Sequence, residues 1–215
     1  MKVKKVVVGI FEANCYILWD EKDKEAIVVD PGEEGERIIE VIRKDSLKIR
    51  SIVNTHTHID HIGANDLLRE KTEAPLLAHS ADVSLLQNAE LNLSALTGKD
   101  RSFGLPDRVL EEGDEIRVGG FSLRILHTAG HTPGSICLYG DNKLFSGDTL
   151  FAGGIGRTDL AGGNLKELQK SIKDKILTLP DEVVVYPGHG PSTTVGKERS
   201  CNFFISQSDD VLWVP

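Results

Sequence analysis

A short stretch of the sequence, NTHTHIDHIG at residues 54–63, contains four side chains of the types that bind metals. They are His56, His58, Asp60 and His61, so three of the seven histidines lie within six positions. Neutral imidazole and carboxylate groups suit zinc, iron, manganese or cobalt. A lone loop histidine is most often a solvated residue, but the pattern HxHxDH after an apolar strand is far more specific for a metal site.

Three further candidates lie far along the chain: His131 in TAGHTPGS, Asp148 in SGDTL and His189 in YPGHGP. Each is in a loop punctuated by Gly or Pro, just past an apolar run that predicts a strand. If these strands share one sandwich, their loops can meet at one edge, where a rigid scaffold usually carries catalytic groups. The set contains no thiolate, which argues against a closed structural zinc site.

The elements that must position these residues alternate between strands and helices, which predicts an α/β chain. Amphipathic patterns predict helices at 33–46, at 62–72 (directly after the histidine cluster) and at 164–179. Apolar runs bounded by turn residues predict strands at 5–11, 15–19, 25–30, 48–55, 74–79, 108–112, 115–120, 121–128, 135–140, 143–148 and 182–191. The first two strands are expected to form a hairpin. No repeat or linker divides the sequence, so we predict one domain over residues 1–215.

Residues 80–106 differ from the rest, because they are polar, mildly helical and rich in small side chains. This composition predicts an insertion or lid within the domain, rather than a part of the core.

Composition excludes some classes of partner. The chain of 215 residues is 40% hydrophobic and 27% charged, with a net charge of −8. Such an acidic balance disfavours nucleic acid or an anionic membrane as the main partner. No segment approaches the ~18 apolar residues that a membrane span needs, and the apolar run near the start is too short for a secretory signal. Three widely spaced cysteines without a CxxC motif, Cys15, Cys137 and Cys201, favour a reduced, cytoplasmic setting.

The order and spacing of the seven candidates resemble the metallo-β-lactamase superfamily. The resemblance covers nearly the whole chain and implies a four-layer αβ/βα sandwich with two metals at one edge. By position it implies three sets of ligands: His56, His58 and His131 for the first metal, Asp60, His61 and His189 for the second, and Asp148 as a bridge between them.

Further motifs resemble the short members of the glyoxalase II-like branch: GDTLF at 147–151, GRTDL at 156–160 and YPGHGP at 186–191. This implies that a hydroxide between two divalent ions cleaves a thioester such as S-lactoylglutathione or a related acyl thiol. Zinc is the first expectation for the metal, with iron or manganese as alternatives, and Asp60 and Asp148 would be the catalytic residues. Larger glyoxalase II enzymes bind glutathione with the help of a C-terminal helical domain, whereas only 26 residues follow His189 here.

Other members of the superfamily provide alternatives. A persulfide dioxygenase would hold one iron through His56, His131 and Asp148. That branch has Ala-His-Asp around the last histidine, where this chain has Gly188-His189-Gly190, so the comparison favours hydrolysis. A lactonase-like hydrolase remains open. A non-catalytic or nucleic-acid-processing member fits poorly, because no ligand is missing and the chain is acidic.

The resemblance also implies that Arg157, nine residues past Asp148, lies near the substrate. Its guanidinium could bind a substrate carboxylate through two hydrogen bonds. The alternative is an internal ion pair with Asp159, and both roles can hold together.

Four other polar residues are candidates only for supporting roles. The two remaining histidines, His79 and His127, are predicted to have structural or outer roles, because the ligand positions are already filled. Asn14 and Tyr16 could reach the edge of the site, but core packing is the default prediction for both.

Overall fold

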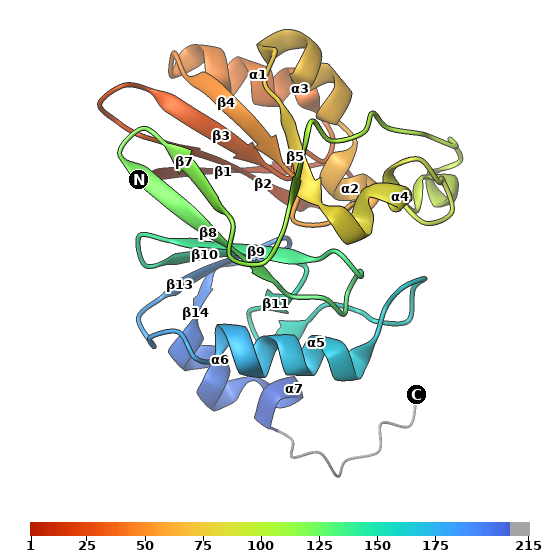
Figure 1. The fold of residues 1–215 in the computed structure, drawn as a ribbon, viewed down its shortest axis with the longest axis vertical. Helices are drawn as coiled ribbons and strands as arrows, with labels where there is room; N and C mark the ends of the chain where they lie inside the picture. Colours follow the sequence, from red (N-terminus) through yellow and green to blue (C-terminus); the bar gives the residue numbers. More distant parts are fainter. Residues whose placement is uncertain (207–215) are drawn as a thin grey trace.

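The computed structural model describes residues 1–206. Two six-stranded sheets lie face to face, and helices cover the outer face of each sheet (Figure 1). The predicted four-layer αβ/βα sandwich is therefore confirmed. Within residues 1–206, no helix has the length and apolar character that crossing a membrane requires.

The first sheet follows the order of the chain, and its strands are β1 (Lys2–Val8), β2 (Ala13–Trp19), β3 (Glu25–Val29), β4 (Lys48–Val53), β5 (Leu76–His79) and β6 (Arg108–Leu110). β1 to β3 pair antiparallel, which confirms the first hairpin, and β3 to β6 pair parallel. Helices α1 (Gly35–Lys44) and α3 (Asn65–Thr72) make two of the parallel crossovers. Ile38, Ile39 and Ile42 of α1 are buried on one side of the helix, as their spacing predicts.

The second sheet has the order β14 (Thr193–Thr194), β13 (Val184–Pro187), β10 (Lys143–Gly147), β9 (Ile136–Gly140), β8 (Phe121–His127) and β7 (Glu115–Val118). Its outer face is covered by α5 (Leu165–Ser171) and α6 (Val195–Cys201), followed by the short α7 (Phe203–Ser206). α5 begins at Asn164, whose side chain accepts a hydrogen bond from the Glu167 amide at 3.1 Å. This is a standard N-cap, and it stabilises the helix by about 1 kcal/mol.

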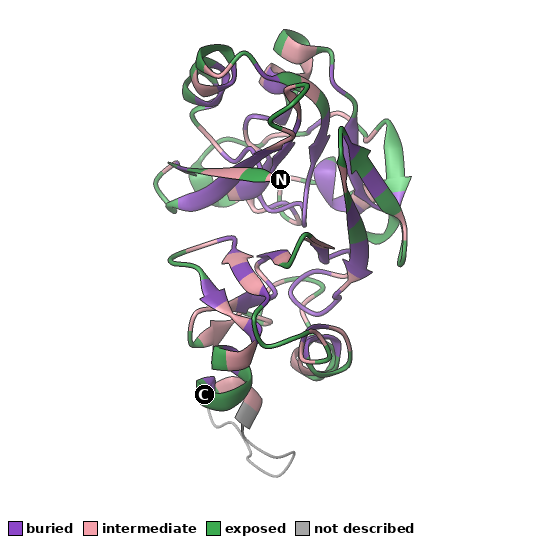
Figure 2. Ribbon diagram, turned by 90° about the vertical axis from the view of Figure 1, so that its left-hand side faces the viewer, coloured by how far each residue is buried: buried purple, intermediate pink, exposed green. Residues whose placement is uncertain are grey.

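One hydrophobic core lies between the sheets, where alternate side chains of both sheets meet. Tyr16 and Phe145 come from opposite sheets and pack edge to face with ring centroids 5.3 Å apart. Buried residues are concentrated on the facing strands, and exposed ones on the outer helices (Figure 2). Two rigid sheets therefore hold the loops at their shared edge.

Several element boundaries differ from the prediction: the helix expected at 164–179 is α5 followed by a π-helical turn at Ile172–Ile176, and the strand expected at 182–191 is the shorter β13. Two other differences lie close to the candidate ligands. β1 ends at Val8, because Gly9 has φ +69° and starts a turn, so the apolar Ile10 and Phe11 are exposed at the tip of the hairpin. The helix expected at 62–72 is preceded by a separate short helix, α2 (Ile59–Ile62), which begins inside the histidine cluster. Its two isoleucines are buried in a small cluster with residues of the 80–106 segment, and this packing favours the early helical turn.

The 80–106 segment contains two 3₁₀ turns, at Ser80–Asp82 and Ser94–Thr97, and the helix α4 (Val83–Leu86). Leu86 and Phe103 are buried against α2, and Arg101 donates a hydrogen bond to the Gly63 carbonyl at 3.0 Å. The segment is thus fixed to the helix that carries Asp60 and His61. Its function as a lid stays a prediction.

Candidate metal centre

The loops that carry the candidate ligands follow four strands from the two sheets. β4 leads to the histidine cluster at 56–61, and β8, β10 and β13 lead to His131, Asp148 and His189. Backbone hydrogen bonds tie two of these loops to a strand of the opposite sheet, from the Ile136 amide of β9 to the Thr55 carbonyl at 2.8 Å and from the Asn14 amide of β2 to the Gly188 carbonyl at 2.7 Å. The structure therefore brings all seven candidate side chains together at one edge of the sandwich.

The first cluster consists of His56, His58 and His131, all at most 3% exposed. Their ring centroids lie between 4.7 and 4.9 Å apart, and His58 Nδ1 is 3.0 Å from His131 Nε2. One nitrogen from each ring lies within 4.8 Å of the others, which is close enough for one ion to bind all three.

The second cluster consists of Asp60, His61 and His189. His61 Nε2 and His189 Nε2 are 3.3 Å apart, and Asp60 Oδ2 lies 3.2 Å from His189 Nε2 and 3.6 Å from His61 Nε2. This cluster is less enclosed than the first, because His189 is 28% exposed and lies at the opening.

Asp148 lies between the two clusters. Its Oδ2 is 3.7 Å from His131 Nε2, in the first cluster, and 3.6 Å from His189 Nε2, in the second. Its Oδ1 is 3.4 Å from His61 Nε2, also in the second. One carboxylate therefore lies close to histidines of both clusters, where it can bridge two ions.

In His131 and His189, a hydrogen bond at Nδ1, which points away from the site, leaves Nε2 free to donate its lone pair to a metal. His131 Nδ1 is 2.8 Å from the Arg157 carbonyl, and His189 Nδ1 is 3.0 Å from the Phe11 carbonyl. A carbonyl oxygen only accepts hydrogen bonds, so each Nδ1 carries the proton. In the neutral ring, Nε2 then keeps a lone pair that points into the site.

Asp30 orients two further rings: His61 by direct contact and His56 through the hydroxyl of Thr55. His61 Nδ1 is 3.1 Å from Asp30 Oδ2. Thr55 Oγ1 donates to that same oxygen at 2.6 Å, so it accepts at 3.2 Å from His56 Nδ1. Histidines that bind metals are commonly oriented by such carboxylate or hydroxyl partners.

Burial and neighbouring charges shift the pKa values in opposite directions. Burial and the adjacent His131 lower the pKa of His58 to about 3, so this ring is neutral and able to bind a cation at neutral pH. Burial also opposes charge on His61, but the carboxylates of Asp148, Asp60 and Asp30 hold its pKa well above the usual value. Burial alone would raise the pKa of Asp148, yet His61 and the other histidines hold it well below its usual range. The carboxylates thus favour positive charge at His61, whereas His58 stays neutral.

Two unpaired buried atoms at the ligand positions show that the side chains fit a bound cation. Within residues 1–206, His56 Nε2 and Asp148 Oδ1 are buried and have no hydrogen-bond partner. In the same range, His58 Nε2 and His79 Nε2 are also unpaired, but His58 faces His131 with its Nδ1, and His79 belongs to neither cluster. Leaving such atoms unpaired is costly, and native proteins rarely do so without a reason. A metal bound among these donors would supply the missing partner for those that face it.

Two buried carboxylates in the surrounding shell were missed by the sequence analysis. Asp30, at the end of β3, is 1% exposed and also accepts from the Thr55 amide at 2.7 Å. Asp82 is fully buried and accepts from the Gly134 amide at 2.6 Å and from Thr132 Oγ1 at 2.8 Å, in the loop of His131. The sequence could have indicated both residues, because each is an acidic residue at or just beyond the end of an apolar strand: Asp30 in VVD and Asp82 in AHSAD.

Arg157 lies in the wall of the cavity beside the site and forms the predicted ion pair with Asp159. Its Nε and Nη2 donate to the two carboxylate oxygens of Asp159 at 2.8 and 2.7 Å. Its binding to a substrate carboxylate stays a prediction.

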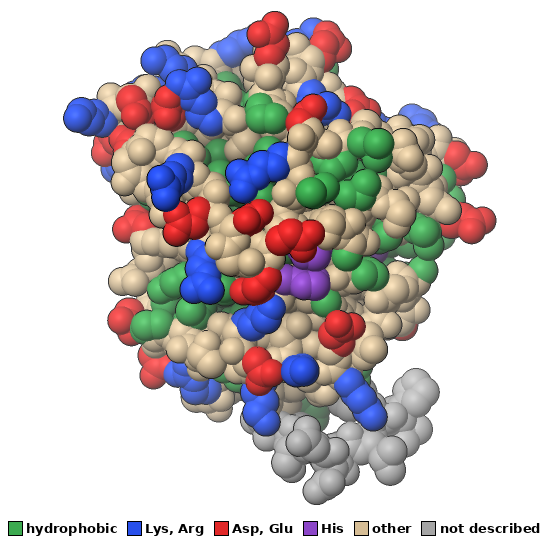
Figure 3. Space-filling model, viewed as in Figure 1, with side chains coloured by type: hydrophobic (Ala, Val, Ile, Leu, Met, Phe, Trp, Pro, Cys, Tyr) green, Lys and Arg blue, Asp and Glu red, His purple; other side chains and the backbone are tan. Residues whose placement is uncertain are grey.

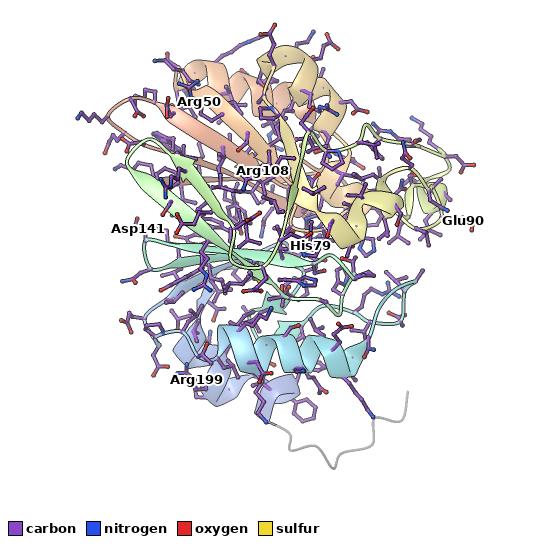
Figure 4. The ribbon with its side chains drawn as sticks, in the orientation of Figure 1. Arg50, His79, Glu90, Arg108, Asp141 and Arg199 are labelled. Atoms are coloured by element: carbon purple, nitrogen blue, oxygen red, sulfur yellow. The ribbon has the colours of Figure 1, made fainter. Side chains whose placement is uncertain are left out.

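The supporting residues are placed largely as expected. Asn14 and Tyr16 are buried, and their polar ends also donate to the Pro187 carbonyl at 2.8 and 2.7 Å, which holds the loop of His189. His79 and His127 stack on each other with ring centroids 3.9 Å apart. Among the described residues neither belongs to a group that could hold a metal, and His79 lies at the end of β5 (Figure 4).

Comparison with protein-family models gives a match over residues 8–189 to the model described as "Metallo-beta-lactamase superfamily". The chain belongs to the metallo-β-lactamase superfamily. Members of this superfamily bind divalent metals, which agrees with the His and Asp clusters described above.

Curated relatives within the superfamily are similar over nearly their whole length. The probable metallo-hydrolase YqgX of Bacillus subtilis is 42% identical over 209 residues, which cover 96% of this chain and 98% of the relative. The hydroxyacylglutathione hydrolase GloC of Haemophilus influenzae is 36% identical over 216 residues, which cover 96% and 99%. These similarities identify the chain as a metal-dependent hydrolase of the metallo-β-lactamase superfamily.

Solved structures of the superfamily match as well. The B3 metallo-β-lactamase BLEG-1 has a TM-score of 0.91 at 39% identity, and the match covers 96% of this chain and 100% of that one. TTHA1623 in a di-iron-bound form has a TM-score of 0.84 at 38% identity, covering 94% and 100%.

We predict that Gly188→Ala displaces the bridging position. A Cβ at Gly188 would overlap Asp148 Oδ1 and lie 2.7 Å from His61 Cε1, so one of these side chains must move. We expect the affinity for the second metal to fall by about 10-fold or more, the usual effect of disturbing the groups that orient ligands. Competitive titration with a chelator measures it. Gly154→Ala is the control, because its nearest neighbour is Phe151 Cβ at 3.8 Å; an equal loss of affinity in both variants would contradict the prediction.

Proposed function

We propose that the protein is a binuclear hydrolase that cleaves thioesters. The observation that carries the proposal is Asp148, with one oxygen 3.7 Å from His131 Nε2 and the other 3.4 Å from His61 Nε2. A carboxylate placed between two clusters of ligands favours two coupled ions over one.

His56, His58 and His131 would hold one ion, Asp60, His61 and His189 the other, and Asp148 both. Zinc is the first expectation, and iron or manganese also suits these nitrogen and oxygen donors. Bound divalent ions would lower the pKa of water toward ~7, and so supply hydroxide at neutral pH, and would polarise the substrate carbonyl.

The side chains around the substrate have definable tasks. Burial would raise the pKa of Asp60, but His61 and a hydrogen bond from His189 hold it below its usual range, so Asp60 is a carboxylate at neutral pH. We assign Asp60 and Asp148, as carboxylates that would bind the ions, the orientation of the attacking water. Water oxygen bonds to the acyl carbon, the C–S bond breaks with its electron pair on sulfur, and the water proton ends on the thiolate.

Two features support hydrolysis over persulfide oxidation by a single iron. The second cluster of Asp60, His61 and His189 is complete, although a single-iron site does not need it. Gly188 lies where the dioxygenase branch has alanine. This structure has no space for an alanine side chain at that position, because a Cβ there would overlap Asp148. The similarity to GloC further supports a thioester as the substrate.

We also propose a cytoplasmic setting and a small-molecule substrate. Within residues 1–206, Cys15, Cys137 and Cys201 are all free thiols, as a reducing compartment allows. On the face seen in Figure 3, Lys and Arg side chains are interspersed with Asp and Glu, and this mixture is unsuited to tracking a nucleic-acid backbone.

The test is a panel on the purified protein: metal content, hydrolysis of S-lactoylglutathione and other thioesters, hydrolysis of a β-lactam, and oxygen uptake with glutathione persulfide. The β-lactam is included because of the similarity to BLEG-1. We expect about two metal ions per chain and thioester cleavage that a chelator abolishes and added metal restores. Oxygen uptake without thioester cleavage would overturn the proposal, and so would cleavage that persists without metal.

A further inference from the structure

The candidate ligands open into a cavity of about 460 Å³ whose wall has two different parts. Its floor is formed by ligand side chains such as His58, Asp60 and Asp148. Beyond the floor, the wall is formed mainly by apolar side chains, namely Phe11, Leu93, Leu96, Phe151, Ile155 and Leu160. A ligand held at the floor must therefore extend along a mostly apolar surface.

The apolar wall comes from three separate parts of the chain. Phe11 lies at the tip of the β1–β2 hairpin, Leu93 and Leu96 lie in the 80–106 segment, and the others lie in or after the small hairpin of β11 (Leu150–Phe151) and β12 (Gly154–Ile155). Phe11 is 49% exposed and Leu96 is 77% exposed. Exposed apolar side chains that gather around a cavity mark a binding surface more often than single ones scattered over a protein do.

The wall beyond the floor carries few charged side chains. Among the described residues that line the cavity, Arg157 is the only Lys or Arg. Asp159 already uses two of the five N–H donors of this guanidinium, at Nε and Nη2. One ligand carboxylate would therefore share Arg157 with Asp159, and a second would find no Lys or Arg among the described residues of the wall.

We propose, resting on the proposed thioesterase function, that this cavity selects thioesters whose groups beyond the reacting carbonyl are uncharged and apolar. Glutathione carries two carboxylates and an ammonium group, and burying unpaired charge is strongly unfavourable. When an apolar group of the substrate binds against this wall, the apolar surfaces of both are buried from water, which favours binding. Glutathione thioesters are then poorer substrates of the same reaction.

The test compares two thioesters that share the lactoyl group: S-lactoylglutathione and the lactoyl thioester of benzyl mercaptan, an uncharged thiol. Each kcat/KM is divided by the rate constant for hydrolysis by hydroxide in solution, which corrects for the different leaving groups. We expect the normalised value to be about 10-fold higher for the benzyl compound, which is the scale of discrimination that apolar pocket contacts provide. The corresponding thioethers, which cannot be hydrolysed, should inhibit with the same ranking.

A pair of variants tests the wall itself. Leu96→Ser should reduce the preference for the benzyl thioester by about 3-fold or more, chiefly through KM. Leu105→Ser is the control, because Leu105 is in the same segment, is 49% exposed and lies outside the cavity wall. Hydrolysis of both thioesters with equal normalised efficiency, or with glutathione preferred, would overturn the inference and leave the thioesterase function standing. Hydrolysis of neither would overturn both, and an equal effect of the two variants would overturn the role of the wall.

Discussion

Replacing Asp148 with asparagine is expected to leave no more than about one metal ion per chain and to lower thioester hydrolysis by about 10²–10⁴-fold, the range for losing a positioned acid–base or electrostatic group. Asparagine keeps the shape of the side chain but has one acceptor oxygen and no charge. The neutral amide would no longer offer two charged oxygens to the ions, while His61 and His131 would both lose the carboxylate that lies 3.4 and 3.7 Å from their Nε2 atoms. Metal analysis and steady-state kinetics measure both effects.

Asp141→Asn is the matched control, because Asp141 is 50% exposed and lies in the turn before β10, at the opposite end of that strand from Asp148 (Figure 4). It pairs only with Lys143 and the N-terminus among the described residues. We expect its metal content and activity to match those of the unaltered protein. An Asp148→Asn variant with two ions and full activity would exclude a bridging role for this carboxylate.

Replacing Asp30 with alanine should destabilise the metal-free protein by about 3 kcal/mol and weaken metal binding by about 10–100-fold. The variant would leave the amide and hydroxyl of Thr55 and the Nδ1–H of His61 without their acceptor in a buried site. The loss of stability is the cost of these unpaired donors, together with the left-handed backbone of residue 30, where φ is +52° and alanine is less favourable than aspartate. The loss of affinity follows because the rings of His61 and His56 are no longer oriented. Urea denaturation and competitive metal titration measure the two effects separately.

The control is Asp66→Ala, because Asp66 is exposed and its carboxylate accepts one long hydrogen bond, from the Gly104 amide at 3.4 Å. We expect its free energy of unfolding to change by less than about 0.5 kcal/mol. If Asp30→Ala were as stable as this control and bound metal equally well, Asp30 would have no role in organising the centre.

Much of the fold and of the candidate centre could be predicted because it depends on local pattern. Alternating strands and helices, together with polar loops after strands, placed His56, His131, Asp148 and His189 at strand ends, and the structure brings them together. The resemblance to a known superfamily added the sandwich, which the observed sheets confirm.

The parts that could not be predicted depend on contacts between distant segments. Asp30 reads as the end of a strand, and its importance appears only when Thr55 and His61 lie against it. Likewise, the run Val6–Phe11 reads as one strand, but Phe11 lines the same cavity as Leu96, from a distant part of the chain. Periodicity reports which side chains avoid water, not which distant partner covers them.

The origin of the ligands has a consequence for the stability of the whole molecule. His56, His58, Asp60 and His61 follow a strand of the first sheet, whereas His131, Asp148 and His189 follow strands of the second. Each ion would therefore bind ligands from both sheets, and the unfolded chain would have no such site. Free metal at about 100 times its dissociation constant would then stabilise the fold by about 2.7 kcal/mol. The melting temperature of the protein should therefore rise with the concentration of free metal. Loss of the metal would lower the stability of the fold and also abolish catalysis.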